Sequence, residues 1–210
     1  MLEARILIAD DDAMTRLDLR RMIEDLGYSV VGEADNGEDA CRLARSLRPD
    51  LTILDIMMPQ MSGLDAAATI SRERLGAVVL LTAYSDAHMI EQANRAGVLA
   101  YLVKPFRQQE VQPAIDIAIA RYRELVALEG ALEAAQEQAE TNRLIGRAKR
   151  VLMYWHGLSD QEAFRRLQAQ ALATKRTLRE IAEAILLADE MTIAGDGGPA
   201  KPRTGHRKGV

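Results

Sequence analysis

The chain has 210 residues, of which 48% are hydrophobic and 28% are charged, the usual balance of a globular protein with a buried core. No apolar run reaches the roughly 20 residues needed to cross a bilayer, and the N-terminus leads into a strand-like segment instead of a signal sequence. We therefore expect a cytoplasmic protein with no membrane segment. The single cysteine, Cys41, excludes an internal disulfide and a multi-cysteine metal site.

Charge is distributed unevenly along the chain. Residues 1–122 hold 13 Lys and Arg against 19 Asp and Glu, and residues 123–140 hold one against five. Residues 141–190 hold nine against six, and residues 191–210 hold four against one. An acidic N-terminal part and a basic C-terminal part indicate two domains with different partners, the second suited to a polyanion.

Five short apolar runs alternate with helix-like segments over the first half of the chain. The apolar pattern predicts strands at residues 5–9, 29–34, 51–54, 77–81 and 100–103. Helices are predicted between them, at residues 13–27, 38–48, 64–74 and 87–96. Because each parallel crossover needs a helix on one face, this alternation predicts an α/β fold with a doubly wound, five-stranded parallel sheet.

Polar residues follow the predicted strands at their C-terminal ends, which open on one edge of such a sheet. Asp10 and Asp11 follow the first strand, Asp55 the third, Thr82 the fourth and Lys104 the fifth. Clustered carboxylates favour a hard cation with oxygen ligands, for which Mg²⁺ is best suited. The cation would draw a phosphoryl donor against Asp55, while Lys104 and Thr82 meet the phosphoryl oxygens. These residues predict an aspartyl phosphate; the alternative is a solvated acidic turn.

Residues 5–120 resemble a two-component response-regulator receiver domain. The motifs that carry the resemblance are Ala9-Asp10-Asp11-Asp12, Leu54-Asp55-Ile56-Met57-Met58-Pro59 with Ser62-Gly63, Leu81-Thr82-Ala83, and Tyr101-Leu102-Val103-Lys104-Pro105-Phe106. The resemblance implies a flavodoxin-like fold and a sensor histidine kinase as partner. It also implies that the domain catalyses only its own phosphoryl transfer and dephosphorylation.

By this resemblance Asp55 is the phosphoacceptor. Asp11, Asp55 and the backbone carbonyl of Met57 would bind Mg²⁺, and Asp10 would support the ion through water. Met57 lies two residues after Asp55, and Tyr84 two residues after Thr82. Neither side chain is suited to orient an attacking water, so we expect a long-lived aspartyl phosphate.

The resemblance also makes Thr82 and Tyr101 the switch pair that senses phosphorylation. It implies a cis bond between Lys104 and Pro105, a conformation for which proline is the usual requirement. The alternative for Lys104 and Pro105 is an ordinary turn, and for Tyr101 it is packing.

A helix is predicted from Glu110 for some forty residues. A stripe recurs along it at spacings of three and four, with apolar residues at Leu125, Leu128, Leu132, Ala135 and Ala139 and a polar, register-setting position at Asn142. Such a stripe is typical of a short coiled coil, which would make a homodimer on phosphorylation. The alternative is that the stripe folds back on its own receiver or C-terminal domain. Gly130 could break the helix, because glycine costs about 1 kcal/mol relative to alanine there.

The following segment predicts a small all-α domain of three helices. The first ends near Tyr154, and the others span residues 159–171 and 178–189. Ser159 with Glu162, and Thr177 with Glu180, form capping boxes at the two later helices. So small a bundle leaves little room for a catalytic pocket.

This segment resembles an ANTAR domain, an RNA-binding antitermination module. The residues that carry the resemblance are Ile145-Gly146-Arg147-Ala148-Lys149, Leu152-Met153, His156-Gly157-Leu158-Ser159, Glu162-Ala163-Phe164-Arg165 and Leu178-Arg179-Glu180-Ile181-Ala182. The resemblance implies binding to paired RNA hairpins in nascent leaders, which prevents a terminator from forming. It also implies that Ala148 and Lys149 contact the RNA.

Further RNA contacts are candidates on physical grounds. Arg143, Arg147 and Arg150 can meet phosphates, and Trp155 can stack on an unpaired base. The alternatives are a solvated basic face and a packed Trp155. Arg150 stands where the family usually has glycine, so it adds a contact or crowds the hairpin. A response regulator that acts on DNA or on a protein partner is the alternative function.

We therefore expect four parts along the chain. They are a receiver domain at residues 1–122, a helical linker at 123–140, an RNA-binding ANTAR domain at 141–191 and a disordered basic tail at 192–210.

Overall fold

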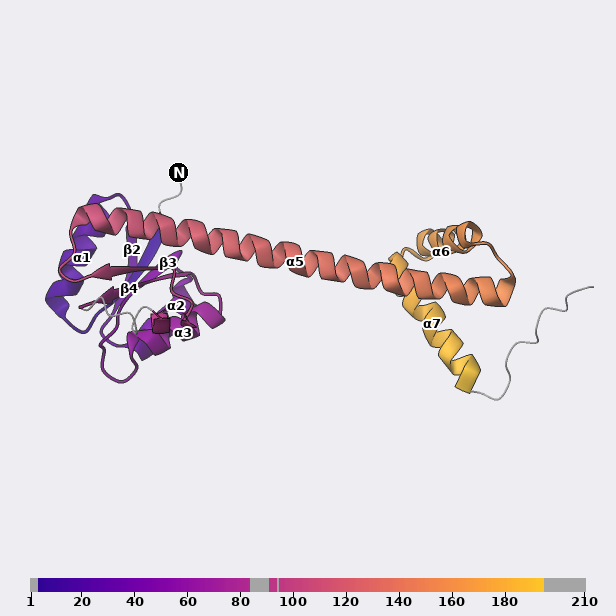
Figure 1. The fold of residues 1–210 in the computed structure, drawn as a ribbon, viewed down its shortest axis with the longest axis horizontal. Coiled ribbons are helices and arrows are strands. Elements are labelled where there is room, and N and C mark those ends of the chain that lie inside the picture. The colour runs from indigo at the N-terminus through magenta and orange to yellow at the C-terminus, as the bar shows by residue number, and fades with distance from the viewer. Residues whose placement is uncertain (1–3, 84–90, 94, 195–210) are drawn as a thin grey trace, which may run out of the picture. The chain divides into compact units, whose positions relative to one another are not determined.

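The structure, a computed structural model, describes residues 4–83, 91–93 and 95–194. The chain divides into two units, residues 1–128 and residues 129–210 (Figure 1). Helix α5 (Gln108–His156) contributes residues to both units. The predicted basic tail lies mostly outside the described residues, as does Tyr84.

The first unit is built on one five-stranded sheet in the order β2-β1-β3-β4-β5. The strands are β1 (Arg5–Ala9), β2 (Ser29–Ala34), β3 (Leu51–Asp55), β4 (Ala77–Thr82) and β5 (Ala100–Val103). Every neighbouring pair is parallel. The predicted doubly wound α/β fold is therefore confirmed.

Helices cover both faces of this sheet, because successive strand residues point to opposite sides. Helix α1 (Ala13–Asp25) and the first part of α5 pack on the face that carries Ile6 and Ile8. Helices α2 (Gly37–Leu47) and α3 (Gly63–Arg72) pack on the face that carries Leu7 and Ala9. In the region predicted as a helix at residues 87–96, residues 91–93 and 95 are helical and residue 96 is in a turn, whereas residues 87–90 and 94 lie outside the described residues.

The second unit is a three-helix bundle formed by the last part of α5, α6 (Asp160–Thr174) and α7 (Leu178–Ala194). The predicted capping box at α6 is present: Ser159 N donates to Glu162 Oε2 at 2.8 Å, and Glu162 N donates to Ser159 Oγ at 3.4 Å. The buried core residues come from all three helices: Ala148, Leu152, Ala163, Leu167, Ile181, Ala182 and Leu186. Helix α7 continues past the predicted end at Asp189.

Helix α5 is continuous through Gly130, so the break considered there is absent. The surrounding Ala, Leu and Glu residues are strong helix formers, which offsets the glycine cost of about 1 kcal/mol. Leu125, Leu128 and Leu132 are 47%, 61% and 59% exposed. The predicted apolar stripe is thus a surface feature of the chain. No helix in the described part of the chain is long and apolar enough to cross a membrane.

Candidate functional site

The polar residues at the strand ends meet at the carboxyl edge of the sheet, as the strand register requires. β1 pairs in register with β3, which brings Asp10, next after β1, beside Asp55 at the end of β3. β4 pairs in register with β5, which brings Thr82 beside the strand that leads into Lys104. Residues up to 94 positions apart in the sequence therefore share one small site.

Lys104 joins the two buried carboxylates of this site. Its Nζ lies 2.6 Å from Oδ2 of Asp10 and 2.5 Å from Oδ1 of Asp55. The second carboxylate oxygen of Asp55 accepts a hydrogen bond of 2.8 Å from the main-chain N–H of Met57. The main-chain N–H of Lys104 donates to the carbonyl oxygen of Thr82 at 2.7 Å. The Asp55 carboxylate is therefore oriented from both sides.

Burial sets the electrostatics of this group. Asp10 is fully buried and Asp55 is 7% exposed. Burial raises the pKa of Asp55; Lys104 and the Met57 N–H oppose this effect, and the charge of Asp10 adds to it. Burial by itself would lower the pKa of Lys104, but its two carboxylate partners outweigh burial and raise that pKa. Two buried carboxylates thus share one cation, which leaves a net negative site.

The carboxylates fit a divalent cation. One oxygen each from Asp10, Asp11 and Asp55 lie within 4.8 Å of one another, and Asp11 is exposed at the mouth of the site. An all-oxygen, acidic donor set of this kind suits Mg²⁺, which keeps several waters and takes few protein ligands. Bound there, Mg²⁺ would supply charge neutralisation at the phosphoryl oxygens.

Two further residues support this site, and the sequence predicted a role in it for neither. Arg16 Nη1 donates to the carbonyl oxygen of Asp10 at 2.6 Å and holds the acidic turn in place. Gly63 packs against the main chain of Asp55, where an added Cβ would lie 1.9 Å from the Asp55 carbonyl oxygen. Only Gly63 had a sequence signal, as part of the Ser62-Gly63 motif. The role of Arg16 depends on how α1 packs beside the turn.

The expected switch residues occupy different environments. Thr82 is buried at the site, whereas Tyr101 is 48% exposed on β5. The bond between Lys104 and Pro105 is cis, which confirms that prediction. The side chain of Met57 is 76% exposed, in contrast to the buried Asp10 and Asp55.

The predicted RNA-binding residues of the second unit differ in exposure. Arg143 and Arg150 are exposed on α5, and Arg143 pairs with Glu140 at 3.0 Å. Arg147 lies 3.9 Å from Glu190 of α7. Within the described residues, Arg150 is paired with no carboxylate. Of these three arginines, Arg150 is the one most available to an outside phosphate.

Lys149 is held inside its own domain. Its Nζ lies 2.6 Å from Oδ1 of Asp160 and 5.9 Å from the centre of the Phe164 ring. Its side chain is 22% exposed. An anion at Lys149 would therefore compete with Asp160 for the same ammonium group.

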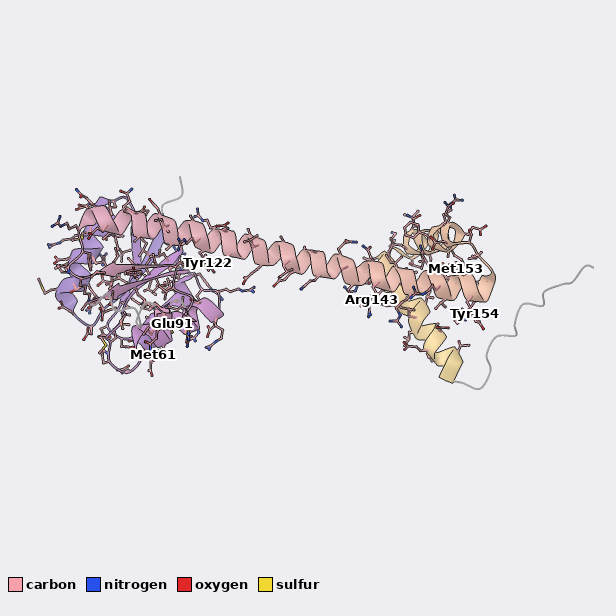
Figure 2. The ribbon with its side chains drawn as sticks, in the orientation of Figure 1. Met61, Glu91, Tyr122, Arg143, Met153 and Tyr154 are labelled. Atoms are coloured by element: carbon pink, nitrogen blue, oxygen red, sulfur yellow. The ribbon has the colours of Figure 1, made fainter. Side chains whose placement is uncertain are left out.

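Ala148 and Trp155 occupy different depths in the bundle. Ala148 is fully buried in the core, so its side chain packs within the bundle. Trp155 is partly exposed, and the neighbouring Tyr154 is 68% exposed. In Figure 2, Tyr154 projects from α5 on the side away from Met153, which packs against the core.

Two family descriptions match the chain, one in its acidic first half and one in its second half. Residues 6–116 match the response regulator receiver domain, and residues 133–186 match the ANTAR domain. The chain is 43% identical over 182 residues to the transcriptional regulatory protein PdtaR of Mycobacterium tuberculosis, which covers 87% of this chain and 89% of PdtaR. It is also 37% identical over 113 residues to the chemotaxis protein CheY of Thermotoga maritima, which covers 53% of this chain and 94% of CheY.

Solved structures support the assignment of the first unit. The signal receiver domain of a modulated diguanylate cyclase from Desulfovibrio desulfuricans superposes with a TM-score of 0.54 and 32% identity, covering 58% of this chain and 97% of that one. The response regulator domain of Thermotoga maritima CheB gives a TM-score of 0.53 and 27% identity, covering 56% and 97%. The chain belongs to the family of response regulators that join a receiver domain to an ANTAR domain.

Proposed function

We propose that the chain is a transcriptional regulator that is phosphorylated on Asp55 by a sensor histidine kinase and then binds hairpin RNA in nascent transcripts to promote antitermination. The observation that carries the proposal is the Asp10–Lys104–Asp55 site in the same chain as an ANTAR domain. The relative PdtaR is named a transcriptional regulatory protein, which supports a role in gene control. The expected location is the cytoplasm, where kinase and transcript would meet.

The site is arranged for phosphoryl transfer to Asp55. A carboxylate oxygen of Asp55 attacks the phosphorus of a phosphohistidine, the P–N bond breaks, and the imidazole nitrogen takes up a proton. Asp11, Asp55 and the Met57 carbonyl would hold Mg²⁺, with Asp10 as a supporting carboxylate, and the ion would supply positive charge beside the incoming phosphoryl group. Lys104 moves from a carboxylate oxygen of Asp55 to a phosphoryl oxygen, which keeps its charge compensated. The Thr82 hydroxyl meets another phosphoryl oxygen, and Tyr101 responds to that change.

The output surface lies on the basic side of α5. Arg150, Arg143 and Arg147 bind phosphates of the RNA backbone, and Lys149 binds one while sharing its charge with Asp160. Trp155 offers a partly exposed ring to an unpaired base. Ala148 acts through packing, since it is buried beneath this surface.

The exposed stripe on α5 supports a homodimer. Leu125, Leu128 and Leu132 are exposed at spacings of three and four, which suits a second copy of the same helix. Two copies would present two RNA-binding domains, which matches a target of paired hairpins. Phosphorylation of Asp55 then favours RNA binding by favouring the dimer.

Gel shifts with a two-hairpin leader RNA and with duplex DNA, at matched salt, test this proposal. The chain is treated with acetyl phosphate and Mg²⁺, or left untreated. We expect the RNA to shift at lower protein concentration after treatment, and the D55N variant to lose that gain. Binding to the duplex alone, or no nucleic-acid binding, would favour the alternative of a response regulator acting on DNA or on a protein partner.

A further inference from the structure

A pocket of about 720 Å³ opens between the three helices of the second unit, within the range of about 300–1,000 Å³ that is usual for small-ligand pockets. The lining residues that matter here are Gln138, Asn142, Gly146, Lys149, Phe164 and Arg179. They come from α5, α6 and the N-terminal end of α7. Polar, charged and aromatic groups therefore converge on one concave surface.

Gly146 is the least explained residue of this pocket. It lies inside α5, where glycine is less favourable than alanine. A Cβ built on Gly146 meets no atom within 4 Å, so the fold itself does not require glycine there. Glycine is the residue that lets a ligand approach the backbone closely. Gly130 is equally open in the same helix, but it is not among the pocket residues.

The polar groups of the pocket match the edge of a nucleobase. Gln138 Nε2 donates to Asn142 Oδ1 at 3.1 Å, and among the described residues neither the Gln138 carbonyl oxygen nor the Asn142 amino group forms another hydrogen bond. An amide acceptor beside an amide donor is the pattern that reads the hydrogen-bonding edge of a base. Phe164 adds an apolar wall, and Lys149 and Arg179 bring positive charge.

The cations of the pocket are already partly neutralised. Arg179 lies 3.7 Å from Glu137 and 2.9 Å from Glu183, and Lys149 is paired with Asp160. A strongly charged anion alone would have to displace these carboxylates. A nucleotide makes contacts through its base as well as through its phosphate. It therefore fits a pocket that has both amide and charged groups better than a simple anion does.

We propose that the pocket takes one unstacked base from the loop of the bound RNA. The base lies over the α5 backbone at Gly146, its edge bonds to Gln138 and Asn142, and its phosphate lies near Lys149 and Arg179. This inference rests on the proposed function, because it presumes that the chain binds hairpin RNA.

The test compares Gly146→Ala with the matched control Gly130→Ala in the full chain. A pool of two-hairpin RNAs with randomised loops is selected on the wild type, treated with acetyl phosphate and Mg²⁺, and the selected RNA is the probe. Both variants should raise Tm by about 2–4 °C, since alanine favours the helix. Only Gly146→Ala should weaken RNA binding, by about tenfold or more, because it fills the base site.

An abasic substitution at each loop position locates the base. Removal of the base at one position should lower the affinity of the wild type for the RNA about tenfold. The same removal should not lower the affinity of Gly146→Ala further. Asn142→Ala is the second variant, for use if Gly146→Ala does not fold, because Asn142 lies on the exposed side of α5. It should weaken binding of RNA that carries the same base. If Gly146→Ala folds and its RNA affinity is unchanged, the pocket assignment is overturned. The same holds if the variant changes self-association and leaves RNA affinity unchanged. A pool from which the wild type selects no RNA overturns the proposed function and this inference with it.

Discussion

The Nζ of Lys104 lies 2.5 Å from Oδ1 of Asp55 and holds the carboxylate that we propose as phosphoacceptor. The same ammonium neutralises the fully buried Asp10. The Lys104 side chain thus neutralises carboxylate charge in the unphosphorylated site and lies close enough to Asp55 to contact an incoming phosphoryl group.

Replacement of Lys104 by Met should reduce the free energy of unfolding by about 1–3 kcal/mol, since it leaves two buried carboxylates without their cation. It should also reduce phosphorylation by acetyl phosphate at least tenfold, because the phosphoryl oxygens lose their partner. Urea unfolding and a phosphate-labelling assay measure the two effects. Lys104→Arg, which keeps the charge, is the control. Unchanged labelling in a folded Lys104→Met variant would contradict the role of this residue.

Replacement of Asp55 by Asn should abolish labelling by acetyl phosphate, since the amide is not a nucleophile for this reaction. It should also weaken Mg²⁺ binding, which isothermal titration calorimetry measures. Asp12→Asn is the matched control: Asp12 caps α1 through the N–H groups of Met14 and Thr15, and Asn caps a helix equally well. The control should keep labelling and Mg²⁺ binding. Labelling of Asp55→Asn at the wild-type level would exclude Asp55 as the phosphoacceptor.

Tyr28 gives the first unit a pH-dependent contribution at alkaline pH. Its hydroxyl donates to Oδ1 of Asp116 at 2.6 Å, and burial together with this carboxylate raises the pKa of Tyr28 to about 12. A phenol whose pKa is higher in the folded than in the unfolded state stabilises the fold below about pH 10. That contribution is lost as the pH rises from about 10 to about 12.

Phenolate absorbance followed against pH should therefore contain a late component from Tyr28, near pH 12. Tyr28→Phe should remove this late component, and Asp116→Asn should move it to lower pH. A titration of Tyr28→Phe that still contains the late component would assign it to another tyrosine.

Arg150 and Lys149 should differ in their effect on RNA binding. Arg150→Ala should lower the slope of log affinity against log salt by about one, because Arg150 is exposed and can release one counterion on binding. Lys149→Ala should reduce the slope less, since Asp160 already neutralises the ammonium at 2.6 Å. Affinities measured over a series of salt concentrations give both slopes. Equal slopes for wild type and Arg150→Ala would place Arg150 outside the RNA contact.

The exposed stripe on α5 predicts a self-association surface. Leu128→Glu and Leu132→Glu should prevent the dimer that we expect after acetyl phosphate treatment, because a charge replaces an apolar contact at the seam. Sedimentation velocity measures the change in mass. Glu124→Gln, off the apolar stripe, should leave the dimer intact. Dimers that persist in both leucine variants would exclude this stripe as the interface.

Much of the fold could be predicted from the sequence, because each prediction depended on local patterns. The apolar runs of the first half of the chain marked the strands, and the capping residues Ser159 and Glu162 marked the start of α6. Asp10, Asp55, Thr82 and Lys104 could also be grouped in advance. They terminate or follow parallel strands, and parallel strands present their carboxyl ends on one edge.

Other features depended on long-range packing, which a local pattern does not contain. The sequence showed Ala148 and Lys149 as neighbours in one motif, but the bundle buries Ala148 and pairs Lys149 with Asp160 of α6. It showed Arg16 as one more helix residue, but the packing of α1 directs its guanidinium to the Asp10 carbonyl. The sequence by itself determined which residues could do the chemistry. Tertiary structure decided which are buried, paired or open, because burial and ion pairing depend on residues that are distant in the chain.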